Sequence, residues 1–149
     1  MAINRDYLGR RFAATEPYEV SRVKIADFAD AIGDPNPLYR DRTAARAAGY
    51  ADVIAPPTFA IVISMTGSAR AIGDPGLGLN YAMVVHGEQS FEYSRQIVAG
   101  DVLTAEVTIS DIRDAGRNVM LTTLTEIRTV EGEHVCTARS TLVDRSGAA

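Results

Sequence analysis

Apolar residues recur at helical spacing in the first half of the chain. After Ser21, a residue type that can cap a helix, one buried face is predicted at the i, i+3, i+4, i+7 positions Ile25, Phe28, Ala29 and Ile32. Pro35 and Pro37 end this helix, because proline lacks a backbone donor and disfavours helical geometry in the residue before it. A second, short helix is predicted to begin at Asp41 and to end at Gly49, which can supply a left-handed C-terminal residue.

The stretch from Phe59 to Met65 is almost wholly apolar and follows two prolines. A short buried strand and a helix both fit such a run. The helix is favoured, because the segment continues to Ala71 with only Gly67 as a breaker. A helix that is apolar on every side is expected to be buried on every side.

The second half of the chain predicts strands. Apolar and polar residues alternate with a period of two from Leu103 to Ser110, and further strands are predicted at 84–93, 119–129 and 134–143. Helices followed by an antiparallel meander predict an α+β fold, in which a long sheet curls around the apolar helix. We expect one domain over residues 1–149, with a core at about 18–143 and a frayed tail at 144–149.

Composition excludes several classes of function. A total of 15 Lys and Arg residues against 19 Asp and Glu gives a net charge of −4 without a basic run, which argues against a nucleic-acid partner. One cysteine cannot form an internal disulfide framework. The longest apolar run, Phe59–Ile63, is far shorter than the roughly 18 residues of a membrane span, and the N-terminus has no apolar signal core. We therefore expect a cytoplasmic protein with no membrane partner.

The most specific motif is Gly33-Asp34-Pro35-Asn36-Pro37-Leu38-Tyr39. It resembles the Gly-Asp-x-Asn-Pro-(Leu/Ile/Val)-His loop of the MaoC-like family of (R)-specific hydratases and (3R)-hydroxyacyl-ACP dehydratases. The resemblance continues through Ile54–Phe59 and Val98–Asp101, and it covers roughly residues 18–143. It implies a single hotdog fold, a curved antiparallel sheet wrapped around a long central helix. The predicted order of helices and strands agrees with that fold.

The resemblance implies reversible addition of water to a trans-2-enoyl thioester. In the family, an Asp and a His five positions apart activate the water, which is acid–base chemistry near neutral pH. Here Asp34 stands at the Asp position, but Tyr39 stands at the His position. A phenol has a pKa of about 10 and is a poor general base at neutral pH. The resemblance implies neither a cofactor nor a metal, and it implies substrate-binding positions at Asn36, Pro37, Leu38, Pro56, Pro57, Thr58 and Phe59.

Pro56 and Pro57 stand where active relatives commonly have His-Gly, whose glycine N–H helps to form the oxyanion hole. Proline has no N–H, so that donor is absent too. The chain therefore resembles the substrate-holding, non-catalytic subunit of heterodimeric mycobacterial-type (3R)-hydroxyacyl-ACP dehydratases. Its expected partners are an acyl-ACP or acyl-CoA thioester and a second hotdog subunit, in a homodimer or in a heterodimer with a catalytic MaoC-like chain.

Other functions remain open on the sequence. The chain can be a self-sufficient homodimeric (R)-specific enoyl-CoA hydratase that uses Asp34 with His86 or Tyr39. An acyl-CoA thioesterase and a non-enzymatic acyl-CoA-binding protein are less favoured, because the Gly-Asp-x-Asn-Pro loop belongs to the hydratase branch. Structural interpretations also exist, with Asp34 as a turn former and Tyr39 as a packing residue. His134 is expected to be solvated, and Cys136 is expected to be a small core residue.

Overall fold

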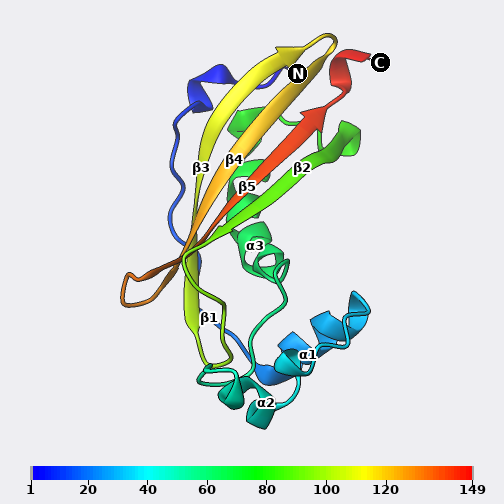
Figure 1. Cartoon of the computed structure of the whole chain (residues 1–149). Helices are drawn as coiled ribbons and strands as arrows, with labels where there is room; N and C mark the ends of the chain where they lie inside the picture. The colour runs from blue at the N-terminus through cyan, green and yellow to red at the C-terminus, as the bar shows by residue number, and fades with distance from the viewer. Residues whose placement is uncertain (1, 149) are drawn as a thin grey trace.

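A five-stranded antiparallel sheet dominates the computed structural model, which describes residues 2–148 (Figure 1). The strands are β1 (Tyr18–Glu19), β2 (Val84–Tyr93), β3 (Val102–Ala115), β4 (Asn118–Thr129) and β5 (His134–Asp144). Their order in the sheet is β1-β3-β4-β5-β2, so β1 and β2 form the two edges. The four predicted strands are confirmed, whereas the two-residue β1 was not predicted.

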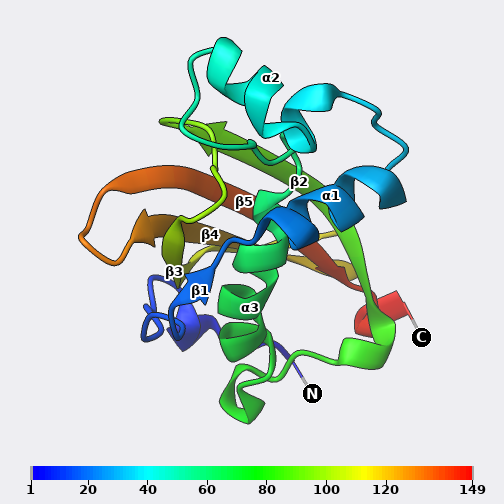
Figure 2. The same ribbon diagram turned by 90° about the horizontal axis from the view of Figure 1, so that it is seen from below.

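The central helix α3 (Ala60–Ile72) lies in the concave face of the curled sheet (Figure 2). Helices α1 (Arg22–Ala31) and α2 (Arg42–Ala47) lie beyond the N-terminal end of α3 (Figure 1). Short 3-10 helices occupy Arg5–Tyr7, Pro37–Tyr39, Pro75–Leu77, Tyr81–Met83 and Ser146–Ala148. The predicted α+β arrangement is confirmed, and the apolar stretch is a helix rather than a strand.

Ser21 caps α1, since its Oγ accepts a hydrogen bond from the Lys24 N–H over 3.0 Å. Ile25 and Ala29 are fully buried, as their spacing predicts. Ile32 is 49% exposed, so its predicted burial is wrong. The reason is that α1 ends at Ala31, and Ile32 is the residue that follows its last turn.

Asp41 caps α2, and its carboxylate accepts hydrogen bonds from the N–H groups of Thr43 at 2.8 Å and Ala44 at 3.2 Å. Gly49, just past this helix, has φ +95°, a left-handed geometry that suits glycine. Both predicted limits of this short helix are confirmed.

The burial of α3 is one-sided, contrary to the prediction. Met65 is 63% exposed, whereas Ser64 and Ser68 are 3% and 9% exposed. Gly67 faces the sheet so closely that a Cβ there would lie 3.2 Å from the Cβ of Ala105. Small residues therefore bring the helix axis close to the sheet, and the larger Met65 side chain stays largely exposed.

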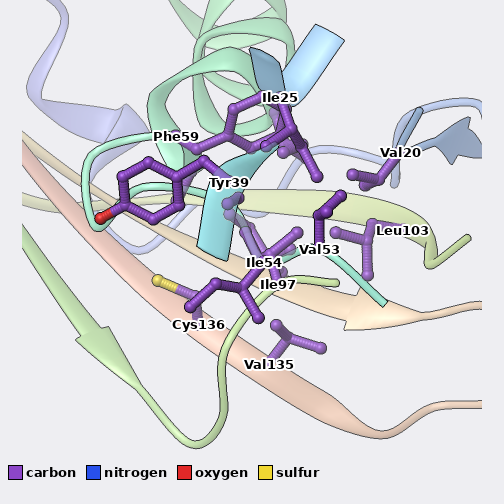
Figure 3. Packing of buried hydrophobic residues seen from close by; sticks show 14 of the residues in the cluster. Val20, Ile25, Tyr39, Val53, Ile54, Phe59, Ile97, Leu103, Val135 and Cys136 are labelled. Atoms are coloured by element: carbon purple, nitrogen blue, oxygen red, sulfur yellow. The ribbon is translucent and has the colours of Figure 1, made fainter. Parts of the chain in front are cut away.

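The larger cluster of buried apolar side chains joins α1, α2, the start of α3 and the facing strands (Figure 3). Ile25 and Phe59 have no exposed surface in this cluster, and the Phe59 ring meets Phe28 edge-on at 5.4 Å between centroids. A second cluster packs Tyr7 and Leu77 against the other end of the sheet. These clusters fix both ends of α3 against the sheet.

The N-terminal segment covers the edge of β3 that β1 leaves free. The N–H of Phe12 donates to the carbonyl of Val107, and the N–H of Thr15 donates to the carbonyl of Ala105, both over 2.9 Å. At the opposite edge, β2 pairs with β5 alone within residues 2–148.

Strand β5 runs through Asp144, which the predicted tail included. The Asp144 carboxylate is buried and accepts hydrogen bonds from the N–H groups of Asn80 at 3.2 Å and Ser146 at 2.8 Å. The ordered core therefore reaches beyond the predicted boundary at residue 143. No helix within the described residues combines the length and the apolar character that crossing a membrane requires.

Candidate functional site

The motif loop is built from two successive side-chain turns. The Asp34 carboxylate accepts a hydrogen bond from the N–H of Asn36 over 3.1 Å, and the Asn36 side-chain oxygen accepts one from the N–H of Leu38 over 3.0 Å. The N–H of Asp34 in turn donates to the carbonyl of Ala29 in α1. Asp34 therefore shapes the turn, as its structural interpretation holds, and its side chain is half-buried.

Tyr39 lies at the end of this loop and is only 6% exposed. Its ring packs in the larger core cluster near Phe59 and Cys136 (Figure 3). Burial, and then the negative charge of nearby Asp34, raise the pKa of the Tyr39 phenol above its ordinary value. The phenol is therefore neutral at physiological pH, so it can donate a hydrogen bond to an acceptor but cannot act as a base.

A side chain of β2 contacts the segment just before α3. The hydroxyl of Tyr93, on β2, donates a hydrogen bond to the carbonyl of Pro57 over 2.6 Å. Burial raises the pKa of this phenol strongly, although the nearby N–H of Ala60 opposes the shift. Pro57 itself has no N–H to offer a ligand. The residue three positions before α3 therefore carries no donor, and its carbonyl already accepts from Tyr93.

Sequence reasoning missed Tyr93. Its alternation on β2 indicates only that it shares the concave face with Phe91 and Gln89, opposite Cys136 of β5. Its contact with Pro57 spans 36 positions in the chain and depends on the curl of the sheet. No local pattern contains that contact.

The predicted substrate-binding residues lie in two groups at this end of the molecule. The first group is the motif loop, in which the Leu38 carbonyl accepts a hydrogen bond from the Ile54 N–H over 3.1 Å. The second group precedes α3, where Pro57 and Thr58 are exposed and Phe59 is fully buried. The structure brings these groups together around Tyr39 and the start of α3. Within them, Phe59 serves the core.

His86 lies in a different place. Its Nε2 is 3.1 Å from the Oγ of Ser140 and 3.1 Å from the carbonyl oxygen of Glu88. It lines a cavity of about 620 Å³ between α3 and strands β2 and β5, together with Ile61, Ser64, Met65, Gln89 and Leu142. Neither Asp34 nor Tyr39 lines that cavity.

His134 and Cys136 lie two positions apart on β5 and have different surroundings. The His134 ring hydrogen-bonds Ser94 and Thr137, and its Nε2 is 3.3 Å from a carboxylate oxygen of Glu126, so it is half-buried in a polar network rather than solvated. Cys136 is a fully buried core residue, as predicted, and burial raises the pKa of its thiol to about 11. Within residues 2–148, no group of three or more His, Cys, Asp or Glu side chains is arranged to hold a metal ion.

The carboxylate of Asp52 pairs with arginines of both α1 and α2. The sequence did not identify this residue as part of the site. Its carboxylate accepts two hydrogen bonds from the Arg22 guanidinium, at 3.0 and 2.8 Å, and lies 3.5 Å from Arg42. The bond with Arg22 holds the pKa of this carboxyl well below its usual range. Asp52 therefore joins α1, α2 and the segment that leads to α3.

Comparisons with known proteins agree with the geometry. Residues 6–138 match the family described as the FAS1-like, dehydratase domain region. The chain is 60% identical over 148 residues to a UPF0336 protein of Thermobifida fusca (strain YX), covering 99% of this chain and 97% of the relative. It is 52% identical over 148 residues to a UPF0336 protein of Saccharopolyspora erythraea, covering 99% and 95%.

Two solved structures share the fold. A MaoC-like dehydratase matches with a TM-score of 0.86 and 31% identity, over 93% of this chain but 42% of that protein's length. The C-terminally truncated HadBC (3R-hydroxyacyl-ACP dehydratase) complex from Mycobacterium tuberculosis matches with a TM-score of 0.85 and 24% identity, over 93% and 97%. The predicted hotdog fold is thereby confirmed, and the chain belongs to the FAS1-like dehydratase family of MaoC-like hotdog proteins.

Proposed function

We propose that this chain is the acyl-thioester-binding subunit of a (3R)-hydroxyacyl-ACP or -CoA dehydratase whose other subunit carries the complete Asp–His pair. The observation that carries the proposal is the position of Tyr39 beside Asp34, where the family motif has histidine. Because the phenol stays protonated, Asp34 has no partner that can take up a proton.

Hydration of an enoyl thioester needs two kinds of group. A base removes a proton from water and returns one to the α carbon of the substrate. Fixed donors also stabilise the thioester oxygen as negative charge develops on it, and removal of one such donor costs about 10²–10³ in rate in other enzymes. Pro57, just before α3, has no N–H to place there, and its carbonyl already accepts a hydrogen bond from the hydroxyl of Tyr93. The lack of a base beside Asp34 and of an N–H at position 57 supports substrate binding without turnover.

The cavity beside α3 supports the binding of an acyl chain. Its volume of about 620 Å³ is in the range of ligand pockets. Ile61 and Leu142 contribute apolar walls, and Ser64 contributes a hydroxyl. The thioester would arrive on acyl carrier protein or on CoA. A second subunit would close the open side of the groove, as expected for a protein whose similar structures include a two-chain dehydratase complex.

The test is purification of this chain with a MaoC-like protein that retains Asp and His, followed by assay of crotonyl-CoA hydration. We expect the complex to be active, the pure chain to be inactive, and Asp→Asn in the partner's motif to abolish turnover. A partner that has full activity alone and never binds this chain would contradict the proposal.

The alternative is a self-sufficient hydratase that uses Asp34 with Tyr39 or His86. Turnover of crotonyl-CoA by the pure chain, abolished by Asp34→Asn, would establish it. The pairing with His86 is disfavoured because His86 lies beside Ser140 in a cavity that Asp34 does not line, and the pairing with Tyr39 is disfavoured because that phenol stays protonated.

A further inference from the structure

The outer edge of β2 is a long strand edge that the described part of the chain leaves uncovered (Figure 1). Strand β2 pairs only with β5, along the ten residues from Val84 to Tyr93. The opposite edge of the sheet is covered by β1 and by the N-terminal segment. An open edge presents unpaired N–H and C=O groups and is a template for another strand.

Exposed apolar side chains gather beside this edge. Met65 and Tyr81 are 63% and 76% exposed and line the groove between α3 and β2, and Val85 on β2 itself is 40% exposed. Apolar surface concentrated next to an unpaired strand is typical of a protein–protein interface. The surface thus combines a strand edge with apolar flanks.

The same edge carries a repeated negative charge. After the irregularity between His86 and Glu88, the residues Glu88, Ser90 and Glu92 face Thr141, Arg139 and Thr137 of β5 on the convex side of the sheet. Both glutamates are exposed. The sequence of β2 contains no Lys or Arg, and Arg139 lies one strand further in.

A second copy of this chain is a poor partner for the edge. In an antiparallel pair, directly opposite side chains lie about 5 Å apart and diagonal ones about 7–8 Å, and like charges there are destabilising. If β2 paired with its own copy about a two-fold axis, a register with Glu88 opposite Glu88 or Glu92 would place like charges face to face. A register with Glu88 opposite Ser90 would place each Glu88 diagonal to Glu88 and Glu92 of the copy. Each of these registers therefore brings glutamates together.

We propose that Glu88 and Glu92 select the chain that pairs with the β2 edge: they oppose pairing with a second copy of this chain and favour a different chain whose strand edge carries lysine or arginine opposite them. This inference rests on the proposed function, because it states the chemistry of the edge by which the catalytic subunit binds. Specificity arises from repulsion as well as attraction, because the glutamates repel a copy of this chain and attract a strand edge that carries lysine or arginine.

A charge-reversed copy of this chain serves as a partner of known chemistry. The variant Glu88→Lys/Glu92→Lys is mixed with the unchanged chain, and association is measured by sedimentation velocity with one of the two labelled. We expect the mixture to associate at least about tenfold more tightly than either protein alone, which corresponds to about 1.4 kcal/mol. The gain should shrink as salt is raised, because exposed charges are screened.

The matched control is Glu16→Lys/Glu131→Lys, which changes the net charge equally at exposed positions outside β2. We expect no gain when this control is mixed with the unchanged chain. The neutral variant Glu88→Gln/Glu92→Gln should self-associate more tightly than the unchanged chain, because the repulsion is removed without a new attraction. Circular dichroism of each variant establishes that it is folded.

Four outcomes of the mixing experiments overturn the inference: self-association of the unchanged chain as tight as that of the mixture, no association in the mixture, equal association with the control, or no gain in the neutral variant. Failure here is distinguishable from failure of the proposed function, which is measured as thioester turnover with a catalytic partner. An active complex whose assembly is unchanged by Glu88→Lys/Glu92→Lys contradicts this inference alone.

Discussion

The phenol of Tyr93 donates a hydrogen bond to the carbonyl oxygen of Pro57 across 2.6 Å. This bond ties the end of edge strand β2 to the residues that begin α3. The Tyr93 ring also lies 6.4 Å from that of Phe91, centroid to centroid, on the concave face of the same strand. This hydrogen bond therefore connects the start of α3 to the strand edge at which we propose that a partner docks.

Removal of the Tyr93 hydroxyl should cost stability. In Tyr93→Phe, the ring is retained and the Pro57 carbonyl loses its donor, so we expect the free energy of unfolding to fall by about 1 kcal/mol. Urea unfolding measures the change. The control is Tyr81→Phe, whose side chain is 76% exposed and should give no change. Equal losses in the two variants would show that the bond to Pro57 contributes nothing.

The elements of the fold could be predicted from the sequence because their signals are local. The period of two in β3 and the cap at Ser21 are each contained within one segment. The error at Ile32 arose because periodicity does not say where a helix ends. The error at Met65 arose because small residues on the other face of α3, not its apolar content, decide which side meets the sheet.

Only part of the candidate site could be predicted from the sequence. Asp34 and Tyr39 lie five positions apart in one motif, so the sequence identified both. Tyr93 and Asp52 reach their partners Pro57 and Arg22 over 36 and 30 positions, and such contacts form only once the sheet has curled.

Asp52 should make stability depend on pH in the acid range. Its folded pKa is lowered by Arg22, so its stabilising contribution is fully present above the unfolded pKa of about 3.9 and is lost as pH falls from there through the folded value. We expect Asp52→Asn to lower the free energy of unfolding by about 1–3 kcal/mol at pH 7. The difference from the unchanged chain should narrow on acidification below pH 4, as measured by urea unfolding at several pH values.

The matched control for Asp52 is Asp30→Asn. Asp30 also pairs with an arginine, Arg40 at 2.6 Å, but its side chain is 69% exposed. An exposed pair of this kind contributes little, so we expect a change of about 0–1 kcal/mol. A loss for Asp52→Asn that is the same at pH 7 and at pH 3 would contradict the assignment of the effect to its charge.

Cys136 should be unreactive in the folded protein. Burial raises the pKa of its thiol to about 11, so almost no thiolate is present at pH 8, and the sulfur has no exposed surface. We expect no reaction with a disulfide reagent at pH 8 until the chain is unfolded in urea, when one equivalent reacts. Rapid labelling of the folded chain would contradict this prediction.

The same thiol gives a pH dependence of opposite sense to that of Asp52. Because the folded pKa is raised, the stabilising contribution is present below the unfolded pKa of about 8.5 and is lost as pH rises towards 11. Tyrosines with raised pKa values also make the free energy of unfolding fall in this pH range. The measurement therefore compares the slope of stability against pH in the variant with that in the unchanged chain. We expect the stability of Cys136→Ala to fall less steeply with pH than that of the unchanged chain.

Two substitutions should introduce the base and the N–H donor of the family motif one at a time. Tyr39→His places an imidazole, which titrates near neutral pH, beside Asp34. This single change should yield little hydration of crotonyl-CoA, because position 57 still has no N–H. Adding Pro57→Gly introduces an N–H there, and we expect the double variant to exceed Tyr39→His by about 10²-fold in rate. Asp34→Asn in that background should abolish the gain. A Tyr39→His variant as active as the double variant would show that no donor is missing, and inactivity of both would place the defect outside these two positions.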